Sequence, residues 1–270
     1  MDELGERLGI GRTAEVYALG DERVVKLMLP DFPEEAGLRE AEVSELINHA
    51  VADAPRFFGT TRVDERLGLV YQRVDGATML DRLQVRPWAY PRLADGLALL
   101  HAEIHAANGS GLPEHRAYLR HMIARAEPVA GSEAVTDARQ RLESLPDGDR
   151  LLHGDMHPGN VIQGAPGAVV IDWMTARAGP PEADVARTLH LLVGSAIPAT
   201  IGGVQRWLIG SLRQAFARRY LRTYRRLRPL DNDVLRAWRL PILVARVGEE
   251  IVEELAALVA AIAAERRSSG

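Results

Sequence analysis

The chain has 270 residues, of which 47% are hydrophobic and 26% charged, which suits one large domain or two closely associated lobes around a real core. A formal net charge of −4 argues against binding nucleic acid by bulk electrostatics, and the absence of cysteine excludes disulfides and thiolate metal sites. The first ten residues lack the pattern of a secretory signal, and the longest apolar run, Leu255 to Ala264, is too short to cross a bilayer. We therefore expect a cytoplasmic protein that works without a membrane or nucleic acid.

The first 75 or so residues predict the order β-β-β-α-β-β. Short β-rich stretches fill residues 4 to 29, among them "AEVYAL" and "RVVKLML" on either side of a Gly20-Asp21 turn. From Pro33 to about Ala50, apolar residues recur at helical spacing. "RFFGTTRV" and "LGLVYQRV" then return to β character, joined by a turn at Asp64 to Gly68.

After Asp75-Gly76 the pattern becomes mainly helical. Leu93, Leu97, Leu100 and Ile104 form one apolar stripe. We expect further helices near residues 115–127, 133–145, 184–193, 204–228 and 242–266, with a strand-loop-strand unit at 150–173 between them. These elements predict an α+β fold with a β-rich N-terminal part and a larger, mainly helical remainder.

The helix expected at residues 204–228 has a basic outer face. Arginines recur from Arg213 to Arg228, while an apolar stripe that includes Phe216, Tyr220 and Tyr224 repeats every four residues. A solvated helix face explains this spacing, because the stripe already accounts for the packing. A surface for RNA or an acidic partner is the alternative.

The segment "RLLHGDMHPGNVIQGAPGAVVIDW" carries the strongest chemical signal. Asp155 is followed by four residues and then by Asn160, and Asp172 follows the apolar run "AVVI". Phosphoryl transfer from ATP needs a carboxylate that orients or deprotonates the acceptor hydroxyl, and oxygen ligands for Mg²⁺. Asp155 suits the first role and Asn160 and Asp172 the second, in the spacing of a kinase catalytic loop.

Two other interpretations of this segment stay open. Asp and Asn are common turn formers, and Pro158-Gly159 makes a loop in any protein. His153, Asp155 and His157 also alternate like the ligands of a metal hydrolase, although no further histidine cluster completes such a shell.

An ATP site also needs a loop over the phosphates, a lysine that holds them and an acid that orients the lysine. "GIGRTAEV" supplies Gly9 and Gly11 of a glycine-rich loop, with Ala14 in place of the third glycine. The same letters satisfy a dinucleotide-binding fingerprint, which requires a helix directly after the loop. Because the β-branched stretch "EVYALGDERVVKLML" follows instead, a Rossmann fold is disfavoured.

Lys26 is the candidate phosphate-binding lysine. It lies inside the apolar stretch "VVKLM" and is one of very few lysines in an arginine-dominated chain, which favours a role for its compact charge. A snorkelling residue on an edge strand is the alternative. Glu40, on the inward face of the following helix, is the expected acidic partner, and Glu42 is the second choice.

With these motifs the chain resembles the aminoglycoside phosphotransferase family, relatives of choline kinase and the fructosamine kinases. The resemblance rests on "HGDMHPGNVI", "VIDW" and "AGPPEADVARTL", which occur in the family's order. It implies a protein-kinase-like bilobal fold, with a nucleotide-binding lobe at residues 1–76 and a catalytic and acceptor-binding lobe at residues 77–270. The His-Gly-Asp start and the His-Pro-x-Asn ending of the loop favour a small acceptor over a protein.

The resemblance also implies roles for individual residues. Gln72 and Val74, in the hinge "LVYQRVDG", would bind adenine through their backbone, and ATP with Mg²⁺ would be the cofactors. Asp184 would brace the backbone of the catalytic loop, and His153 would be architectural.

The identity of the acceptor is left open. A cationic antibiotic needs acids to pair with its ammonium groups, and Glu249 and Glu250 lie in the densest acidic cluster. The stretch around Arg246 would equally suit an acceptor with a carboxylate or phosphate. We expect a monomeric or weakly dimeric kinase acting on a hydroxyl of an antibiotic, or of an amino alcohol, sugar or homoserine-type metabolite. A catalytically silent nucleotide-binding regulator of the same fold is the alternative.

Overall fold

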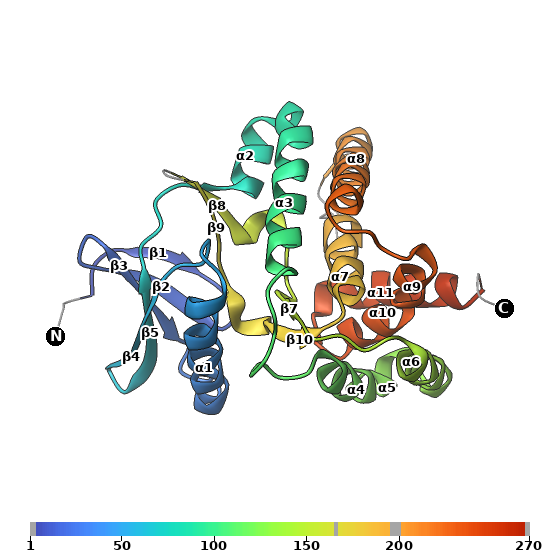
Figure 1. Cartoon of the computed structure of the whole chain (residues 1–270), viewed down its shortest axis with the longest axis horizontal. Coiled ribbons are helices and arrows are strands. Elements are labelled where there is room, and N and C mark those ends of the chain that lie inside the picture. The colour runs from blue at the N-terminus through green and yellow to red at the C-terminus, as the bar shows by residue number, and fades with distance from the viewer. Residues whose placement is uncertain (1–3, 165–166, 195–200, 268–270) are drawn as a thin grey trace. The chain divides into compact units, whose positions relative to one another are not determined.

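The computed structural model describes residues 4–164, 167–194 and 201–267 (Figure 1). The chain divides into two compact units. The sheet unit comprises Met1–Asp81 and Gly159–Thr175, and the helical unit comprises Arg82–Pro158 and Ala176–Gly270. Among the described residues, no helix is both long and apolar enough to pass through a membrane.

The sheet unit is built on a five-stranded antiparallel sheet in the order β1-β2-β3-β5-β4. Its strands are β1 (Arg7–Ile10), β2 (Ala14–Leu19), β3 (Arg23–Met28), β4 (Phe57–Val63) and β5 (Arg66–Gln72). The helix α1 (Glu34–Ala50) packs on this sheet through its apolar face. Gly37 permits a close approach, because a Cβ there would lie 2.6 Å from Leu67. The predicted β-β-β-α-β-β order is therefore confirmed.

A smaller three-stranded sheet completes this unit, in the order β6-β8-β9. It contains β6 (Ala77–Thr78), β8 (Val161–Gln163) and β9 (Ala168–Val170). The N–H of Val170 donates to the carbonyl of Asp53, which ties β9 to the loop after α1. Gly76 has φ +153°, and a Cβ on it would lie 2.6 Å from the carbonyl oxygen of Gln163, so only glycine allows β6 to pair here.

The helical unit contains most of the helices of the chain. They are α3 (Tyr90–Ile104), α4 (His115–Arg125), α5 (Glu127–Ala130), α6 (Ser132–Ser144), α7 (Pro181–Gly194), α8 (Gly203–Leu227), α9 (Asn232–Ala237), α10 (Arg239–Val247) and α11 (Val252–Arg267). The short helix α2 (Met79–Val85) spans the boundary between the two units, and the one-turn helix Pro87–Ala89 follows it. β7 (Arg150–Leu152) and β10 (Arg177–Gly179) form a two-stranded antiparallel sheet among these helices.

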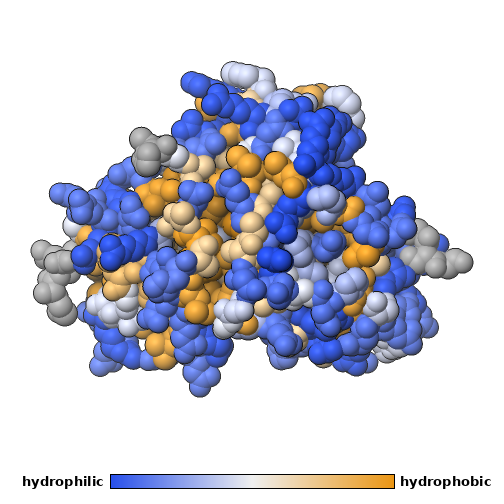
Figure 2. Space-filling model, viewed as in Figure 1, coloured by the Kyte–Doolittle hydropathy of each residue, from blue (hydrophilic) through white to orange (hydrophobic). Residues whose placement is uncertain are grey.

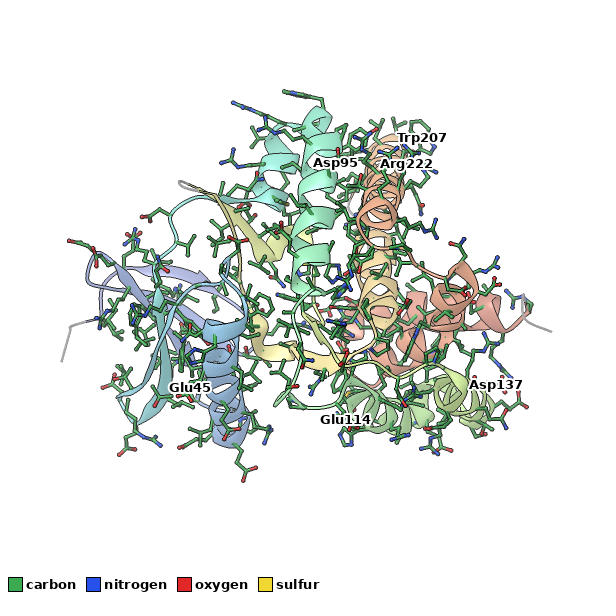
Figure 3. The ribbon with its side chains drawn as sticks, in the orientation of Figure 1. Glu45, Asp95, Glu114, Asp137, Trp207 and Arg222 are labelled. Atoms are coloured by element: carbon green, nitrogen blue, oxygen red, sulfur yellow. The ribbon has the colours of Figure 1, made fainter. Side chains whose placement is uncertain are left out.

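The packing of α8 on α3 explains the amphipathic pattern of α8. Phe216, Tyr220 and Tyr224 are buried, as the apolar stripe predicts. Asp95 of α3, labelled in Figure 3, receives two hydrogen bonds from the guanidinium of Arg219, at 2.7 and 2.6 Å. The part of α8 that faces the viewer in Figure 2 is strongly hydrophilic, which agrees with a solvated outer face.

Two expectations from the sequence need correction. The turn between β4 and β5 is confined to Asp64 and Glu65, both with positive φ, rather than extending to Gly68. The single helix expected at 242–266 is two helices, α10 and α11, separated by residues 248–251. Gly248 keeps a helical backbone, and the chain leaves the helical path at Glu250, which has a φ of +59°. Position 248 itself accepts only glycine, because a Cβ there would lie 2.1 Å from the carbonyl oxygen of Met122.

The strands within residues 150–173 belong to two different sheets, rather than to the single strand-loop-strand unit that the sequence predicts. β7 pairs with β10 in the helical unit, whereas β8 and β9 form a hairpin in the sheet unit. The sequence pattern could not separate them, because each strand has only three residues.

A buried histidine at the start of α4 gives a prediction about stability. His115 is 1% exposed, and neither ring nitrogen has a hydrogen-bond partner in the described part of the chain. Burial lowers its pKa to about 4, from an ordinary value of 6.5. The unfolded chain therefore binds more protons than the folded chain between these values, so stability falls as the pH falls from 6.5 toward 4.

We expect His115→Leu to be as stable as the wild type or more stable at pH 7, because it removes a buried polar group without a partner. The slope of its unfolding free energy against pH should also be smaller than that of the wild type, by up to about 1.4 kcal/mol per pH unit. Urea unfolding at pH 7 and pH 5 measures both effects. His121→Leu, at an exposed position on the same helix, is the control. An unchanged pH slope in His115→Leu would contradict the assignment.

Candidate functional site

In the sheet unit, Lys26 contacts two carboxylates. Its Nζ lies 2.7 Å from Oε1 of Glu40 on α1 and 3.1 Å from Oδ1 of Asp172. Lys26 sits in β3, paired with Val16 of β2 and Leu69 of β5, so it belongs to an inner strand of the sheet. This position argues against the snorkelling edge-strand interpretation, and the expected pairing with Glu40 is present.

The pairing of Lys26 is sheltered from solvent. The Glu40 side chain is 3% exposed, and Tyr71 donates to its Oε1 at 3.4 Å. Burial by itself lowers the pKa of the Lys26 ammonium, but the carboxylates of Asp172 and Glu40 outweigh it and hold the pKa above its ordinary value. The lysine is therefore a fixed positive charge.

Asn160 and Asp172 lie at the same end of the β8–β9 hairpin. Val161 pairs with Val170, and the N–H of Ile171 donates to the carbonyl of Asn160 at 2.9 Å, which continues the pairing. Asp172 follows directly, with φ +64°, a left-handed backbone that is uncommon outside glycine. Strained residues of this kind concentrate at functional sites. The hairpin thus brings an amide and a carboxylate together, both of which offer oxygen ligands.

The glycine-rich segment forms the turn between β1 and β2. Gly9 lies in β1 opposite Val16, and the N–H of Gly11 donates to the carbonyl of Ala14 at 2.8 Å. Ala14 is buried at the start of β2. A strand follows this turn, so the helix that a dinucleotide fingerprint requires is absent from the described residues here.

Gln72 and Val74, the residues of the expected hinge, lie at the end of β5 and just beyond it. The N–H of Gln72 donates to the carbonyl of Arg56, and the N–H of Arg73 donates to Glu22. Adenine contacts from this segment would therefore have to come from Val74 or from carbonyl oxygens.

In the helical unit, the carboxylate of Asp184 on α7 holds the backbone of the loop that begins at His153. The N–H of His153 donates to Oδ2 of Asp184 at 2.7 Å, and the N–H of Gly154 donates to Oδ1 at 3.1 Å. Asp184 is fully buried, and Gly154 has φ +77°, which glycine adopts without strain. The bracing role expected of Asp184 is confirmed. His153 is also fully buried, and its Nδ1 accepts from the N–H of Asp155 at 3.2 Å.

Two buried histidines, His101 of α3 and His105 directly after it, also contact Asp184. His101 and His105 place their Nε2 atoms 3.1 and 3.3 Å from Oδ2 of Asp184. Their Nδ1 atoms lie 2.7 and 2.5 Å from the hydroxyls of Tyr220 and Tyr224 on α8. A carboxylate can only accept, so each histidine donates from Nε2. Burial keeps His105 neutral by lowering its pKa to about 3, so the hydroxyl of Tyr224 donates to its Nδ1.

Asp155 lies between two basic side chains of the same unit. Its carboxylate oxygens are 3.6 Å from Nε2 of His157 and 3.9 Å from Nη2 of Arg187 on α7. Burial raises the pKa of Asp155, but His157 and Arg187 outweigh burial and hold the pKa well below its ordinary value. Asp155 is therefore a carboxylate at any physiological pH.

In the acid cluster near residue 250, Glu249 and Glu254 are already paired with arginines. The carboxylate of Glu249 accepts hydrogen bonds from Arg187 at 2.6 Å, from Arg246 at 2.5 Å and from the hydroxyl of Tyr118 at 3.0 Å. Arg246 also makes a bidentate pair with Glu254, at 2.7 and 2.8 Å. Opposite charges therefore already satisfy these acids inside the helical unit.

The metal-hydrolase interpretation of His153, Asp155 and His157 has no support. Within the described residues, one group of three could hold a metal ion, namely His101, His105 and Asp184. The tyrosine hydroxyls and loop N–H groups around that group complete its hydrogen bonds instead. His153 supports the loop, and His157 faces Asp155.

Arg187, His101 and His105 were missed by reasoning from the sequence. Arg187 lies within the quoted segment "AGPPEADVARTL", three residues after Asp184, so helical spacing could have placed both side chains on one face of α7. The two histidines, spaced by four residues within an apolar stripe, were a similar signal of buried polar partners. Glu249 was noticed, but as a candidate ligand for the acceptor.

Comparisons with known proteins identify relatives of this fold. A family model described as the phosphotransferase enzyme family matches residues 5–230. A search of curated protein sequences finds no match.

Similar solved structures include an apo form of a thermostable mutant of aminoglycoside phosphotransferase APH(4)-Ia, with a TM-score of 0.71 and 17% identity, covering 99% of this chain and 95% of that one. A ternary complex of such a mutant with AMP-PNP and hygromycin B has a TM-score of 0.68 and 19% identity, and the match covers 98% of this chain and 93% of that one. The GDP and kanamycin complex of APH(2")-IIia has a TM-score of 0.59 and 17% identity, and the match covers 98% of this chain and 92% of that one. These matches confirm the predicted α+β fold with a β-rich N-terminal part and a mainly helical C-terminal part.

The central place of Asp184 leads to a prediction. We expect Asp184→Asn to lower the free energy of unfolding by about 3 kcal/mol or more, because the amide cannot accept from the loop N–H groups and both histidines. Urea unfolding monitored by circular dichroism measures the change. Glu182→Gln, on the same helix but outside the network, is the control and should stay within about 0.5 kcal/mol of the wild type. Equal stability of the two variants would mean that Asp184 does not brace the loop.

Proposed function

Since the chain belongs to the phosphotransferase enzyme family, we propose that it transfers the γ-phosphate of ATP to a hydroxyl group of a small molecule, with Mg²⁺ as cofactor. The observation that carries this proposal is the contact of Lys26 with both Glu40 and Asp172. A sheltered lysine oriented by one acid and adjacent to a second, loop-borne acid is the arrangement that ATP-dependent kinases use to hold phosphates and metal.

The nucleotide would bind to the proposed N-terminal lobe, residues 1–76. The turn containing Gly9 and Gly11 would cover the phosphates, and the ammonium of Lys26 would bind their oxygens. Because Glu40 is buried and fixed by Tyr71, it would hold Lys26 in one position as phosphate approaches. Adenine would lie against the segment from Gln72 to Val74.

Asn160 and Asp172 would hold Mg²⁺. An amide oxygen and a carboxylate oxygen are the hard donors that this ion prefers, and both come from one end of the β8–β9 hairpin. When bound, the ion would neutralise charge on the phosphates. The fixed backbone of Asp172 would keep its carboxylate aimed at that position without reorganisation.

Asp155, in the proposed lobe of residues 77–270, would act on the acceptor. Its carboxylate would accept a hydrogen bond from the acceptor hydroxyl, orient the oxygen toward the γ-phosphorus and take the proton as the new P–O bond forms. Arg187 and His157 keep Asp155 ionised, so the carboxylate is ready before the acceptor binds. Five positions separate Asp155 from Asn160, which limits their Cα separation to at most about 18 Å.

Two acceptor classes remain candidates. Neighbouring structures contain hygromycin B and kanamycin, which supports an aminoglycoside or another antibiotic. A metabolite alcohol of the amino alcohol, sugar or homoserine type is favoured by the pairing of Glu249 and Glu254 with arginines. An acceptor rich in ammonium groups needs unpaired acids, and these carboxylates are already neutralised.

A silent nucleotide-binding regulator is the remaining alternative. Lys26, Glu40, Asp155, Asn160 and Asp172 are all present, which argues against it because a regulator has no need of the acceptor-directed Asp155. ATP binding without ATP consumption in the presence of every acceptor would favour the regulator.

The catalytic role of Asp155 is tested with Asp155→Asn in a coupled assay of ATP consumption. Aminoglycosides, macrolides, peptide antibiotics, amino alcohols and sugars serve as acceptors. We expect the variant to lose at least about 100-fold in kcat with the best acceptor, because the amide cannot take the proton. Binding of ATP should be nearly unchanged. Asp149→Asn, an exposed aspartate close in sequence, should keep full activity. An Asp155→Asn enzyme as fast as the wild type would refute the assignment.

Lys26→Ala tests the nucleotide role. Loss of a charge-assisted phosphate contact should weaken ATP binding by about tenfold or more in calorimetric titration. The KM for the acceptor should change by less than about twofold. Arg23→Ala, an exposed basic residue on the same strand, is the control. Lys26→Arg keeps a positive charge opposite the buried Glu40, so it should preserve the fold. It therefore separates damage to the fold from loss of the lysine contact with phosphate. Equal damage to nucleotide and acceptor binding would count against the phosphate role.

A further inference from the structure

An open cavity of about 760 Å³ lies within the helical unit, away from the catalytic loop. Its described lining comes from α7, α8, α10 and α11 and from the short helix α9 with its neighbours. The volume lies within the range of about 300 to 1,000 Å³ that small-molecule sites occupy in proteins.

The helix α7 separates this cavity from Asp155. Asp184 and Arg187 point from one face of α7 to the catalytic loop, at 2.7 Å from its backbone and 3.9 Å from Asp155. Leu189 and His190 line the cavity. At about 100° per residue, Leu189 lies about 140° around the helix from Asp184, whereas His190 lies one turn after Arg187. None of Asp155, Asp184 and Arg187 belongs to the described lining, so we treat the cavity as a second site.

The wall of the cavity is apolar. Leu189, Leu221 and Leu243 contribute from α7, α8 and α10, and Ala257 and Ala261 contribute from α11. Small alanine side chains on α11 leave the space that larger residues would fill. A ligand with a hydrocarbon or aromatic body would bury apolar surface here, worth roughly 25 cal/mol per Å².

The charged residues in the described lining of the cavity are all arginines. Its described lining includes four arginines and no acid: Arg218, Arg225, Arg236 and Arg239. Asp233 and Glu265, outside the lining, pair with Arg236 and Arg239. Arg225 donates to the neutral amide of Asn232, and among the described residues no carboxylate lies within ion-pair distance of Arg218 or Arg225. Burial lowers the pKa of His190 to about 4, so this residue adds no charge at neutral pH.

We propose that this cavity is a binding site for a small amphipathic anion, with an apolar body against the leucines and a carboxylate, sulfate or phosphate head at Arg218 and Arg225. The one-sided charge decides against a cationic ligand such as an aminoglycoside. Guanidinium groups suit such heads, because their planar N–H groups match two oxygens at once. The proposal does not depend on phosphotransfer, and its test measures binding alone.

Dodecanoate is the probe, and calorimetric titration of the purified chain is the measurement. We expect one bound dodecanoate per chain, and binding of dodecyltrimethylammonium, which has the same tail and the opposite charge, at least about tenfold weaker. A salt concentration near 0.15 M limits the action of arginines elsewhere on the surface, because the Debye length is then about 8 Å. Equal binding of the two amphiphiles, or no binding of dodecanoate, would overturn the proposal.

Two pairs of variants locate the site. Ala261→Trp places an indole inside the cavity and should abolish dodecanoate binding, whereas Ala260→Trp, exposed on the same helix and outside the lining, should not. Arg218→Glu combined with Arg225→Glu should weaken binding roughly tenfold, and Arg222→Glu, on the same helix (Figure 3) but outside the lining, by much less. Dodecanoate binding that survives Ala261→Trp, with an unchanged unfolding midpoint, would place the amphiphile elsewhere and overturn the proposal.

Discussion

One buried carboxylate, that of Asp184, fixes the loop that begins at His153 in the helical unit. Taking a charge out of water is costly, and the cost is offset only when several donors converge on it. Here the donors are two loop N–H groups and two histidines, and two tyrosine hydroxyls fix the histidines in turn. The loop that carries Asp155 is therefore held by three elements far apart in the sequence, α3, α7 and α8.

A second ionic cluster acts on Asp155 from the same helix. Arg187 lies between Asp155 and Glu249, and Glu249 is shared with Arg246 and Tyr118. Glu249 lies in the segment 248–251 between α10 and α11, next to Gly248, which packs against the backbone of Met122. The segment after α10 thus carries the acid that pairs with Arg187 beside Asp155.

The sequence allowed prediction of features that depend on local spacing. The strand order of the first 75 residues, the pairing of Lys26 with Glu40 and the proximity of Asn160 to Asp172 all follow from periodicity and motif distance. The network around Asp184 was only partly foreseen, because a histidine in an apolar stripe looks the same whether or not a carboxylate from another helix meets it. The break at residues 248–251 was missed, because apolar residues recur at helical spacing on both sides of it, while the positive φ of Glu250 leaves no periodic signal. The roles of Asp155, Lys26, Asn160 and Asp172 in catalysis remain predictions.

The placement of Lys26 has a consequence for protein chemistry. It is the only lysine among the 33 lysine and arginine residues of the chain, and its side chain is only 16% exposed, held between two carboxylates. Apart from the terminal amine, acetylation, ubiquitin attachment, amine cross-linking and dye labelling therefore have this one partly exposed amine as their target. An isotope-labelled methyl group introduced at lysine would give a single side-chain resonance, located within the proposed nucleotide site.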